Sequence, residues 1–249
     1  MVNSITIASS EDKNFNYIPK DYSLENNIDY FHVTSNNTIF GTQIKNFYTG
    51  EIPLACDMSS DIFSRIINIE DFDLIYAGAQ KNMGPAGTTL YICKKEILGK
   101  SSVPIPTMLD LKTHSDKDSM FNTPPVFSIY ASMLNLRWLK RIGGLSYIEE
   151  QNEKKSELIY NQIDNSSLFL GTANKEDRSS MNVTFTLTNE ALNETFSKML
   201  LEANINGLKG HRSVGGFRAS MYNAMPFESV SILVDICLLY TSPSPRDRG

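Results

Sequence analysis

A single lysine, Lys81, lies where the sequence changes from an apolar run to small and turn-forming residues. The surrounding stretch, residues 71–87, reads DFDLIYAGAQKNMGPAG, and its first part is apolar enough for a short buried strand. Partial burial lowers the pKa of a lysine ammonium group and frees the amine to attack a carbonyl carbon. The pattern therefore predicts a Schiff-base lysine at the end of a strand. A surface lysine in a loop is the alternative that the local pattern leaves open.

A second group of residues that could do chemistry lies nearer the C-terminus, where basic side chains surround two glycines. Residues 208–225 read LKGHRSVGGFRASMYNAM and contain Lys209, His211, Arg212 and Arg218, in a chain of net charge −5. The fork of donors on arginine matches a phosphate group, and glycines let a loop close around a small anion. These residues predict a phosphate site. The alternative is an ordinary basic loop.

Two polar residues follow other apolar runs. Asp57 comes directly after the run at 52–56, and Thr38 lies in a polar stretch after the run at 30–34. In open α/β sheets, ligands bind beyond the carboxyl ends of the strands, so Asp57 is a candidate for a binding site. The simpler alternatives are that Asp57 caps a helix and that Thr38 forms a turn.

The order of these elements indicates an α/β fold. Runs at 52–56, 72–77 and 88–93 alternate with polar segments, as in a largely parallel sheet covered by helices. Periodicity predicts three helices and one more strand. The helices are expected over 126–142, 144–163 and 191–203, and the strand over 181–187. We place a large domain at 1–145 and a small α+β domain at 146–236.

Composition narrows the class of protein. The 249 residues are 41% hydrophobic and 20% charged, which is enough to bury a sizeable core. The acidic balance, with a pI near 5.3, argues against a nucleic-acid or membrane-surface binder. The three cysteines lack the spacing of a zinc site and the even count of a disulfide framework. With no long apolar run and no signal-peptide layout, we expect a soluble cytoplasmic protein without a metal site.

The segment AGAQKNMGPAG around Lys81 resembles the lysine segment of phosphoserine aminotransferases, which are fold-type I, class-V enzymes that use pyridoxal 5′-phosphate. Four other stretches resemble motifs of the same family in the same order. They are NNTIFG at 36–41, SMFNTPP at 119–125, RSSMNV at 178–183 and KGHRSVGGFRASMYNAMP at 209–226. The resemblance covers most of residues 28–236 and implies a mostly parallel large-domain sheet with a small α+β C-terminal domain.

The resemblance also implies roles for individual residues around the cofactor. Lys81 would hold pyridoxal 5′-phosphate covalently and move the proton during transfer, and Asp57 would pair with the ring nitrogen. Thr38 would bond to the ring oxygen side, and Gln80 is counted with the cofactor-binding residues.

The remaining roles concern phosphate groups. Asn122 and Thr123 would reach the cofactor phosphate of the neighbouring subunit, which makes a homodimer the expected assembly. An ordinary proline turn is the alternative there. His211, Arg212 and Arg218 would bind the phosphate of the substrate.

The implied reaction is a ping-pong transfer of the amino group of glutamate to 3-phosphohydroxypyruvate, giving O-phosphoserine and 2-oxoglutarate in serine biosynthesis. Some family members also accept a phosphorylated keto acid of pyridoxine biosynthesis. One alternative is another fold-type I aminotransferase, against which the His211 and Arg212 pair argues. The other is an inactive or non-catalytic fragment.

Both ends of the chain depart from the family. The resemblance starts well inside the large domain, so the phosphate loop and a stacking aromatic residue are expected to lie upstream of residue 1. Residues 237–249, CLLYTSPSPRDRG, resemble a translated transposase adapter used in DNA library preparation and are interpreted as a non-native tail. We therefore expect the chain as printed to hold the cofactor weakly, or not at all.

Overall fold

The computed structural model describes residues 3–25, 27–212 and 214–241. Its first sheet has four strands in the order β1-β4-β5-β6. These are β1 (Phe31–Thr34), β4 (Leu54–Asp57), β5 (Leu74–Gly78) and β6 (Thr89–Cys93). The first three are parallel and β6 is antiparallel to β5, so the predicted sheet is mostly parallel with one strand reversed.

The reversal of β6 follows from the length of the connection before it. Residues 79–88 are all that joins β5 to β6, whereas a parallel crossover needs a dozen or more residues. Because Lys81 belongs to this short connection, it is held between two paired strands.

One side of this sheet carries the first hydrophobic core. Its buried members come from β4, β5 and the turns beside them. They are Leu54, Cys56, Met58, Ile62, Phe72, Ile75 and Ala77. Since successive side chains of a strand point to opposite faces, the other side carries His32, Tyr76 and Tyr91. The rings of Tyr76 and Tyr91 stack with their centroids 6.4 Å apart.

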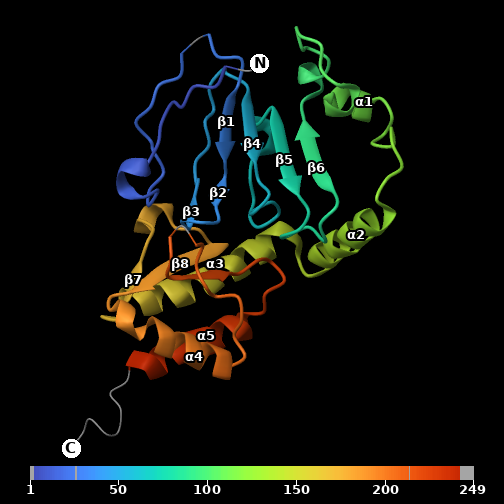
Figure 1. Cartoon of the computed structure of the whole chain (residues 1–249). Coiled ribbons are helices and arrows are strands. Elements are labelled where there is room, and N and C mark those ends of the chain that lie inside the picture. Colours follow the sequence, from blue (N-terminus) through green and yellow to red (C-terminus); the bar gives the residue numbers. More distant parts are fainter. Residues whose placement is uncertain (1–2, 26, 213, 242–249) are drawn as a thin grey trace, which may run out of the picture.

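The second sheet is antiparallel, in the order β7-β8-β9, with β7 (Phe169–Gly171), β8 (Asn182–Leu187) and β9 (Phe217–Ser220). Three helices share its core: α3 (Gly144–Asp164), α4 (Asn193–Glu202) and α5 (Phe227–Thr241). Aromatic rings fill this core, with the ring of Phe185 5.7 Å from that of Phe169 and 5.5 Å from that of Phe217. The carboxyl ends of β1, β4 and β5 point toward this second sheet (Figure 1).

Short elements complete the fold. A two-stranded antiparallel sheet pairs β2 (Asn36–Asn37) with β3 (Thr42–Gln43), and two helices, α1 (Leu111–Ser115) and α2 (Val126–Arg141), follow β6. Short 3-10 helices lie at Glu11–Lys13, Ile69–Asp71, Lys95–Ile97, Thr107–Leu109, Lys175–Asp177 and Glu190–Leu192.

The predicted helices and the extra strand are confirmed. The helices expected over 126–142 and 144–163 are α2 and α3, each within one residue at both ends. The helix expected over 191–203 begins with a 3-10 turn and continues as α4, and the strand over 181–187 is β8. Across the described ranges of the chain, no helix is both long and apolar enough to cross a bilayer.

The division into domains at residue 145 stays a prediction. The buried apolar residues form two clusters, one from residues 54–77 and one from residues 159–237. The segment before β1 nevertheless bonds to the second part of the chain. The Asn174 backbone N–H donates to the Asn16 carbonyl oxygen over 2.8 Å, and the Ile18 N–H donates to the Asp177 carboxylate over 3.0 Å.

Helix α5 continues into the segment interpreted as a non-native tail, residues 237–249. Cys237 is buried in the second core, and the Tyr240 ring lies 5.4 Å from that of Phe196. Residues 242–249 lie outside the described residues. The interpretation as a tail stays a prediction, although its first residues pack against the core.

An ion pair links the C-terminal end of α3 to the segment before β8. The Arg178 guanidinium donates to both carboxylate oxygens of Asp164, over 2.9 and 2.7 Å, and lies 4.4 Å from the centre of the Tyr160 ring. These hydrogen bonds to Arg178, followed by the contribution of Lys175, hold the pKa of Asp164 at about 2. The pair is bidentate, which is the stronger geometry for an arginine and a carboxylate.

We expect the stability that this pair provides to depend on pH. The pKa of Asp164 is lower in the folded than in the unfolded chain, so its contribution is present above pH 3.8 and is lost as the pH falls through 2. Asp164→Asn should lower the free energy of unfolding at neutral pH by roughly 1–2 kcal/mol and flatten its decline in acid. Urea unfolding between pH 7 and pH 2 measures both effects.

Glu194→Gln is the matched control, because Glu194 pairs with Lys198 in an exposed position. It should cost less than about 0.5 kcal/mol at any pH. Equal pH profiles for the wild type and Asp164→Asn would show that the Arg178 pair does not stabilise the fold.

Candidate active site

Three of the predicted site residues lie at one edge of the first sheet. Asp57 is the last residue of β4, Lys81 follows β5 by three residues, and Thr38 follows β1 by four. Because β1, β4 and β5 are parallel, their carboxyl ends meet at the same edge. The structure thus brings together a carboxylate, an amine and a hydroxyl that are far apart in the sequence.

Thr38 contacts basic side chains from both parts of the chain. The Lys81 ammonium donates to the Thr38 hydroxyl over 3.3 Å. The Arg218 guanidinium, from β9 of the second sheet, donates to the Thr38 carbonyl oxygen over 3.3 Å. The Nε atom of Arg218 is buried and has no hydrogen-bond partner within the described part of the chain. One residue therefore holds a lysine and an arginine from different sheets side by side, with donor capacity left for an anion.

The Asp57 carboxylate is fixed by the turn that it begins. The Ser59 backbone N–H donates to Asp57 Oδ1 over 2.8 Å, and the Ser59 hydroxyl accepts from the Gly78 backbone N–H over 3.1 Å. The alternative for Asp57 is a helix cap, and one oxygen of its carboxylate makes a bond of this kind at the start of a turn instead of a helix. In the register of β4 and β5, Asp57 pairs with Tyr76. Burial, and then the charge of Asp57, raise the pKa of the Tyr76 hydroxyl.

The connection that carries Lys81 is tight, and its small residues are required. The Met83 and Gly84 backbone N–H groups both donate to the Ala79 carbonyl oxygen, over 3.2 and 2.7 Å. A side chain at Gly84 would come within 2.5 Å of the Ser132 hydroxyl on α2. Lys81 itself is half-buried, whereas Gln80 is exposed. The expected surroundings of Lys81, small residues and a turn, are therefore present.

The predicted phosphate residues are divided between two places. Arg218 lies on β9, beside Thr38, whereas Arg212 is exposed in the turn before that strand. The turn needs its two glycines, because Gly215 and Gly216 have φ angles of +76° and +60°. His211 is half-buried at the start of the same turn.

Asn122 and Thr123 are not brought to Thr38 within this chain. Both are exposed in the segment between α1 and α2, and the Asn122 side chain donates to the Thr123 carbonyl oxygen over 3.1 Å. This segment lies beyond β6, on the far side of the sheet from β2 and β3 (Figure 1). Their predicted contact with a neighbouring subunit stays a prediction.

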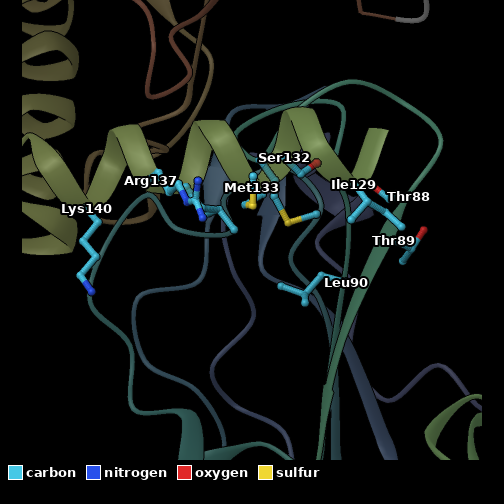
Figure 2. A pocket seen from close by; sticks show the side chains of 10 residues that line it. Thr88, Thr89, Leu90, Ile129, Ser132, Met133, Arg137 and Lys140 are labelled. Carbon is cyan, nitrogen blue, oxygen red and sulfur yellow. The ribbon is translucent and has the colours of Figure 1, made fainter. Parts of the chain in front are cut away.

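An open groove of about 480 Å³ lies between α2 and β6 (Figure 2). Its walls include Leu90, Ile129 and Met133, with Arg137 and Lys140 toward one end. Thr38, Asp57, Lys81 and Arg218 do not line it. The groove is therefore separate from the candidate site.

Sequence reasoning missed the buried polar residues that support Thr38. Asn36, 2% exposed, donates to the Ser60 hydroxyl over 2.9 Å and to Asn182 Oδ1 over 2.8 Å, and its own Oδ1 accepts from the Ser179 hydroxyl. Asn36 and Asn182 belong to two stretches that the resemblance singled out. The signal was thus in the sequence, but only the structure shows that these stretches contact each other.

A second buried network lies beside it, around Asp61. The Asp61 carboxylate accepts from the Gln43 amide over 3.0 Å and pairs with Arg65 at 3.4 Å. Burial raises the pKa of Asp61, and the charge of Arg65 opposes this. Lys45 donates to Gln43 over 2.9 Å, and burial lowers its pKa to about 8. Gln43 and Asp61 are buried and hydrogen-bonded to their neighbours, which favours a supporting role over a reactive one.

The fold and site together define an α/β protein with a half-buried lysine at the carboxyl edge of a mostly parallel sheet. The sequence profile of the aminotransferase class-V family matches residues 5–233. The chain belongs to this family.

Similar proteins within this family include phosphoserine aminotransferases. The chain is 61% identical to a phosphoserine aminotransferase of Flavobacterium psychrophilum over 94% of its own length and 65% of that protein. A solved phosphoserine aminotransferase from Bacillus circulans subsp. alkalophilus superposes with a TM-score of 0.92 at 44% identity, over 98% of this chain and 68% of that one. The PLP-bound enzyme from Trichomonas vaginalis superposes with a TM-score of 0.85 at 34% identity, over 90% of this chain and 64% of that one. The predicted fold type I is confirmed.

We expect Asn36→Ala to destabilise the protein by roughly 2–3 kcal/mol, because it leaves the buried groups of Asn182 and Ser179 without their partner. Urea unfolding of both proteins measures the difference. Asn206→Ala removes an exposed asparagine and should change stability by less than about 0.5 kcal/mol. A loss for Asn36→Ala no larger than for Asn206→Ala would contradict this role.

Proposed function

We propose that this chain carries the active site of a pyridoxal 5′-phosphate-dependent phosphoserine aminotransferase, which transfers the amino group of glutamate to 3-phosphohydroxypyruvate. The observation that carries the proposal is the contact of Lys81 with Thr38, which also accepts from Arg218. The relatives named phosphoserine aminotransferase support it. The chain spans 65% of the length of the Flavobacterium psychrophilum relative, so the activity of a whole enzyme is proposed here and not assigned.

The residues present fit the ring and the carbonyl end of the cofactor. Lys81 supplies the amine that would hold it covalently, Asp57 the carboxylate for its ring nitrogen, and Thr38 a hydroxyl for the ring oxygen side. Gln80 would complete this set from the exposed side. When bound, pyridoxal 5′-phosphate carries the amino group between the two substrates, and its ring takes up the electrons released at the substrate α-carbon.

The chain's own residues then divide the work. The Lys81 amine, half-buried and 3.3 Å from the Thr38 hydroxyl, would move the proton between the substrate α-carbon and the cofactor carbon that receives the amino group. Thr38 orients the amine, and the Ser59 N–H orients the Asp57 carboxylate. The paired strands on either side of residues 79–88 restrict the motion of the lysine.

Three basic residues would bind the anionic groups of the substrate. The sequence predicts that His211, Arg212 and Arg218 all bind the phosphate. The position of Arg218 beside the reactive amine favours the carboxylate, which is attached directly to the reacting carbon. Arg212 and His211, in the turn before β9, would then receive the distal phosphate.

The proposal extends to the oligomeric state of the protein and to its place in the cell. We propose a homodimer in which Asn122 and Thr123 reach the cofactor phosphate of the neighbouring site, since both side chains are exposed. The enzyme would act in the cytoplasm, in serine biosynthesis and, if it also accepts the second phosphorylated keto acid, in pyridoxine biosynthesis.

Covalent trapping tests the role of Lys81. The 249-residue chain is incubated with pyridoxal 5′-phosphate, reduced with borohydride, digested, and mapped by mass spectrometry. We expect modification to concentrate at Lys81 and to be lost in Lys81→Arg. Lys45→Arg is the matched control, because the pKa of Lys45 is also low for a lysine, at about 8, but Lys45 lies outside the site. A wild-type pattern without preference for Lys81 would contradict the proposed function.

Ligand-binding measurements distinguish the proposed roles of Arg212 and Arg218. In the cofactor-loaded protein, Arg212→Ala should weaken the binding of O-phosphoserine by about 10-fold or more, because one charged hydrogen bond is worth about 1.5–3 kcal/mol. The binding of glutamate should weaken less. Arg218→Ala should weaken both ligands, since both carry an α-carboxylate. Titration calorimetry measures the affinities, and Lys209→Ala, an exposed basic residue of the same segment, is the control. Equal losses for both ligands in Arg212→Ala would exclude the phosphate role.

A further inference from the structure

Three consecutive backbone carbonyl groups lie in the turn that begins at Asp57, and each accepts a hydrogen bond from a different buried asparagine. The Ile62 carbonyl accepts from Asn82 over 3.1 Å. The Phe63 carbonyl accepts from Asn223 over 2.8 Å. The Ser64 carbonyl accepts from Asn152 over 3.0 Å. We refer to Asn82, Asn152 and Asn223 as the asparagine clamp.

The three asparagines are also bonded to one another. The Asn223 backbone N–H donates to Asn82 Oδ1 over 2.9 Å, and the Asn152 amide donates to Asn223 Oδ1 over 2.9 Å. All three are nearly inaccessible, with exposures of 4%, 1% and 6% for Asn82, Asn152 and Asn223. Within the described residues the Asn152 Oδ1 atom is buried without a hydrogen-bond partner, whereas all three side-chain amide groups donate. A network of this kind restricts relative positions, because a shift of any member leaves a further buried polar group unpaired.

Two of the three members lie in segments that carry a residue of the candidate site. Asn82 is next to Lys81, and Asn223 lies five residues after Arg218. The clamped turn itself starts at Asp57. Asn152, on α3, contacts none of these three residues through the bonds given above, and it ties the turn and the segment after β9 to the helix that joins the two sheets.

Two further contacts hold the clamp from outside. The Asn135 amide on α2 donates to the carbonyl oxygens of Asn82 and Met83, over 2.7 and 3.1 Å. The buried ammonium of Lys155 on α3 donates to the carbonyl oxygens of Tyr222 and Met225, both over 3.2 Å, on either side of Asn223.

The turn has a backbone reason to need such support. Phe63 has a φ angle of +58°, in the left-handed region that large side chains rarely adopt. A conformation of this kind persists only where its surroundings impose it. The clamp caps the carbonyl groups of Phe63 and of both its neighbours.

We propose that the asparagine clamp is a positioning device, which holds Asp57, Lys81 and Arg218 in fixed relative places across the two sheets. The inference rests on the proposed function, because it concerns the residues assigned there. The clamp has no direct part in the chemistry. It acts by restricting the segments that carry the amine, the carboxylate and the guanidinium.

The test uses the trapping reaction on the 249-residue chain, with pyridoxal 5′-phosphate as the probe. The measured quantity is the ratio of modification at Lys81 to modification at Lys198, an exposed lysine on α4. Asn152→Ala and Asn223→Ala should each lower this ratio roughly tenfold, although the hydrogen bonds described for these two side chains go to residues other than Lys81. Asn152→Leu has nearly the same size and lacks the amide donor without adding a charge, so it serves where the alanine variant does not fold.

Leu200→Ala is the matched control for stability. Leu200 is 3% exposed in the second core and lies outside the clamp, so its truncation should destabilise the protein by about 2–5 kcal/mol. The ratio should stay at the wild-type value in this variant, measured below the onset of its urea transition.

The outcomes separate the two proposals. A ratio that falls in the clamp variants and not in Leu200→Ala supports the positioning role. If the wild type is modified preferentially at Lys81 but the clamp variants show the same ratio as Leu200→Ala, the positioning role is overturned. The proposed function then stays in place. A wild type without preference for Lys81 overturns the proposed function, and the positioning role falls with it.

Discussion

The candidate site depends on one interaction, the meeting of two cationic side chains at Thr38. Lys81 reaches its hydroxyl from the first sheet and Arg218 reaches its carbonyl oxygen from the second. Two cations repel each other, so they stay adjacent only where other contacts hold their backbones. Those contacts are buried polar networks that join loops of the first sheet to the second part of the chain, through the bonds of Asn36 to Asn182, of Ser180 to Gln43 and of Asn223 to Phe63.

Such networks determine the relative position of the two sheets more than they add to the free energy of unfolding. A buried hydrogen bond adds little net free energy, but leaving one partner unmet costs about 1–3 kcal/mol. The two sheets could therefore pack through apolar side chains alone and still slide against each other. Directional bonds such as that of Asn36 to Asn182 exclude those alternatives. An enzyme that must align an amine with an anion-binding group gains from this kind of contact.

Membership of the class-V aminotransferase family agrees with this arrangement. The family profile spans both sheets, from residue 5 to residue 233, so the residues that join them fall within the matched region. The site residues from the first sheet all follow its parallel strands, where α/β folds bind ligands. The second sheet supplies an arginine, which meets a carboxylate or phosphate with two parallel bonds.

The sequence by itself determined the local features of this protein. The apolar run and the small residues around Lys81 predicted a strand followed by a tight turn, and the periodicity at 126–163 predicted α2 and α3 within a residue. These features depend on neighbours in the chain, so a pattern of residue types reports them. The reversed β6 could also have been read from its ten-residue connection, but the alternation of runs favoured a parallel strand.

Only the tertiary structure decided which distant residues meet. The residue types around Asn82, Asn152 and Asn223 do not show that these asparagines are buried together, because their hydrogen-bond partners lie 20 to 160 positions away in the sequence. The same holds for Arg218, whose separation from Arg212 depends on the pairing of β9 with β8. The sequence specifies the type of each side chain, whereas the packing of the folded chain determines which partner a buried polar group contacts.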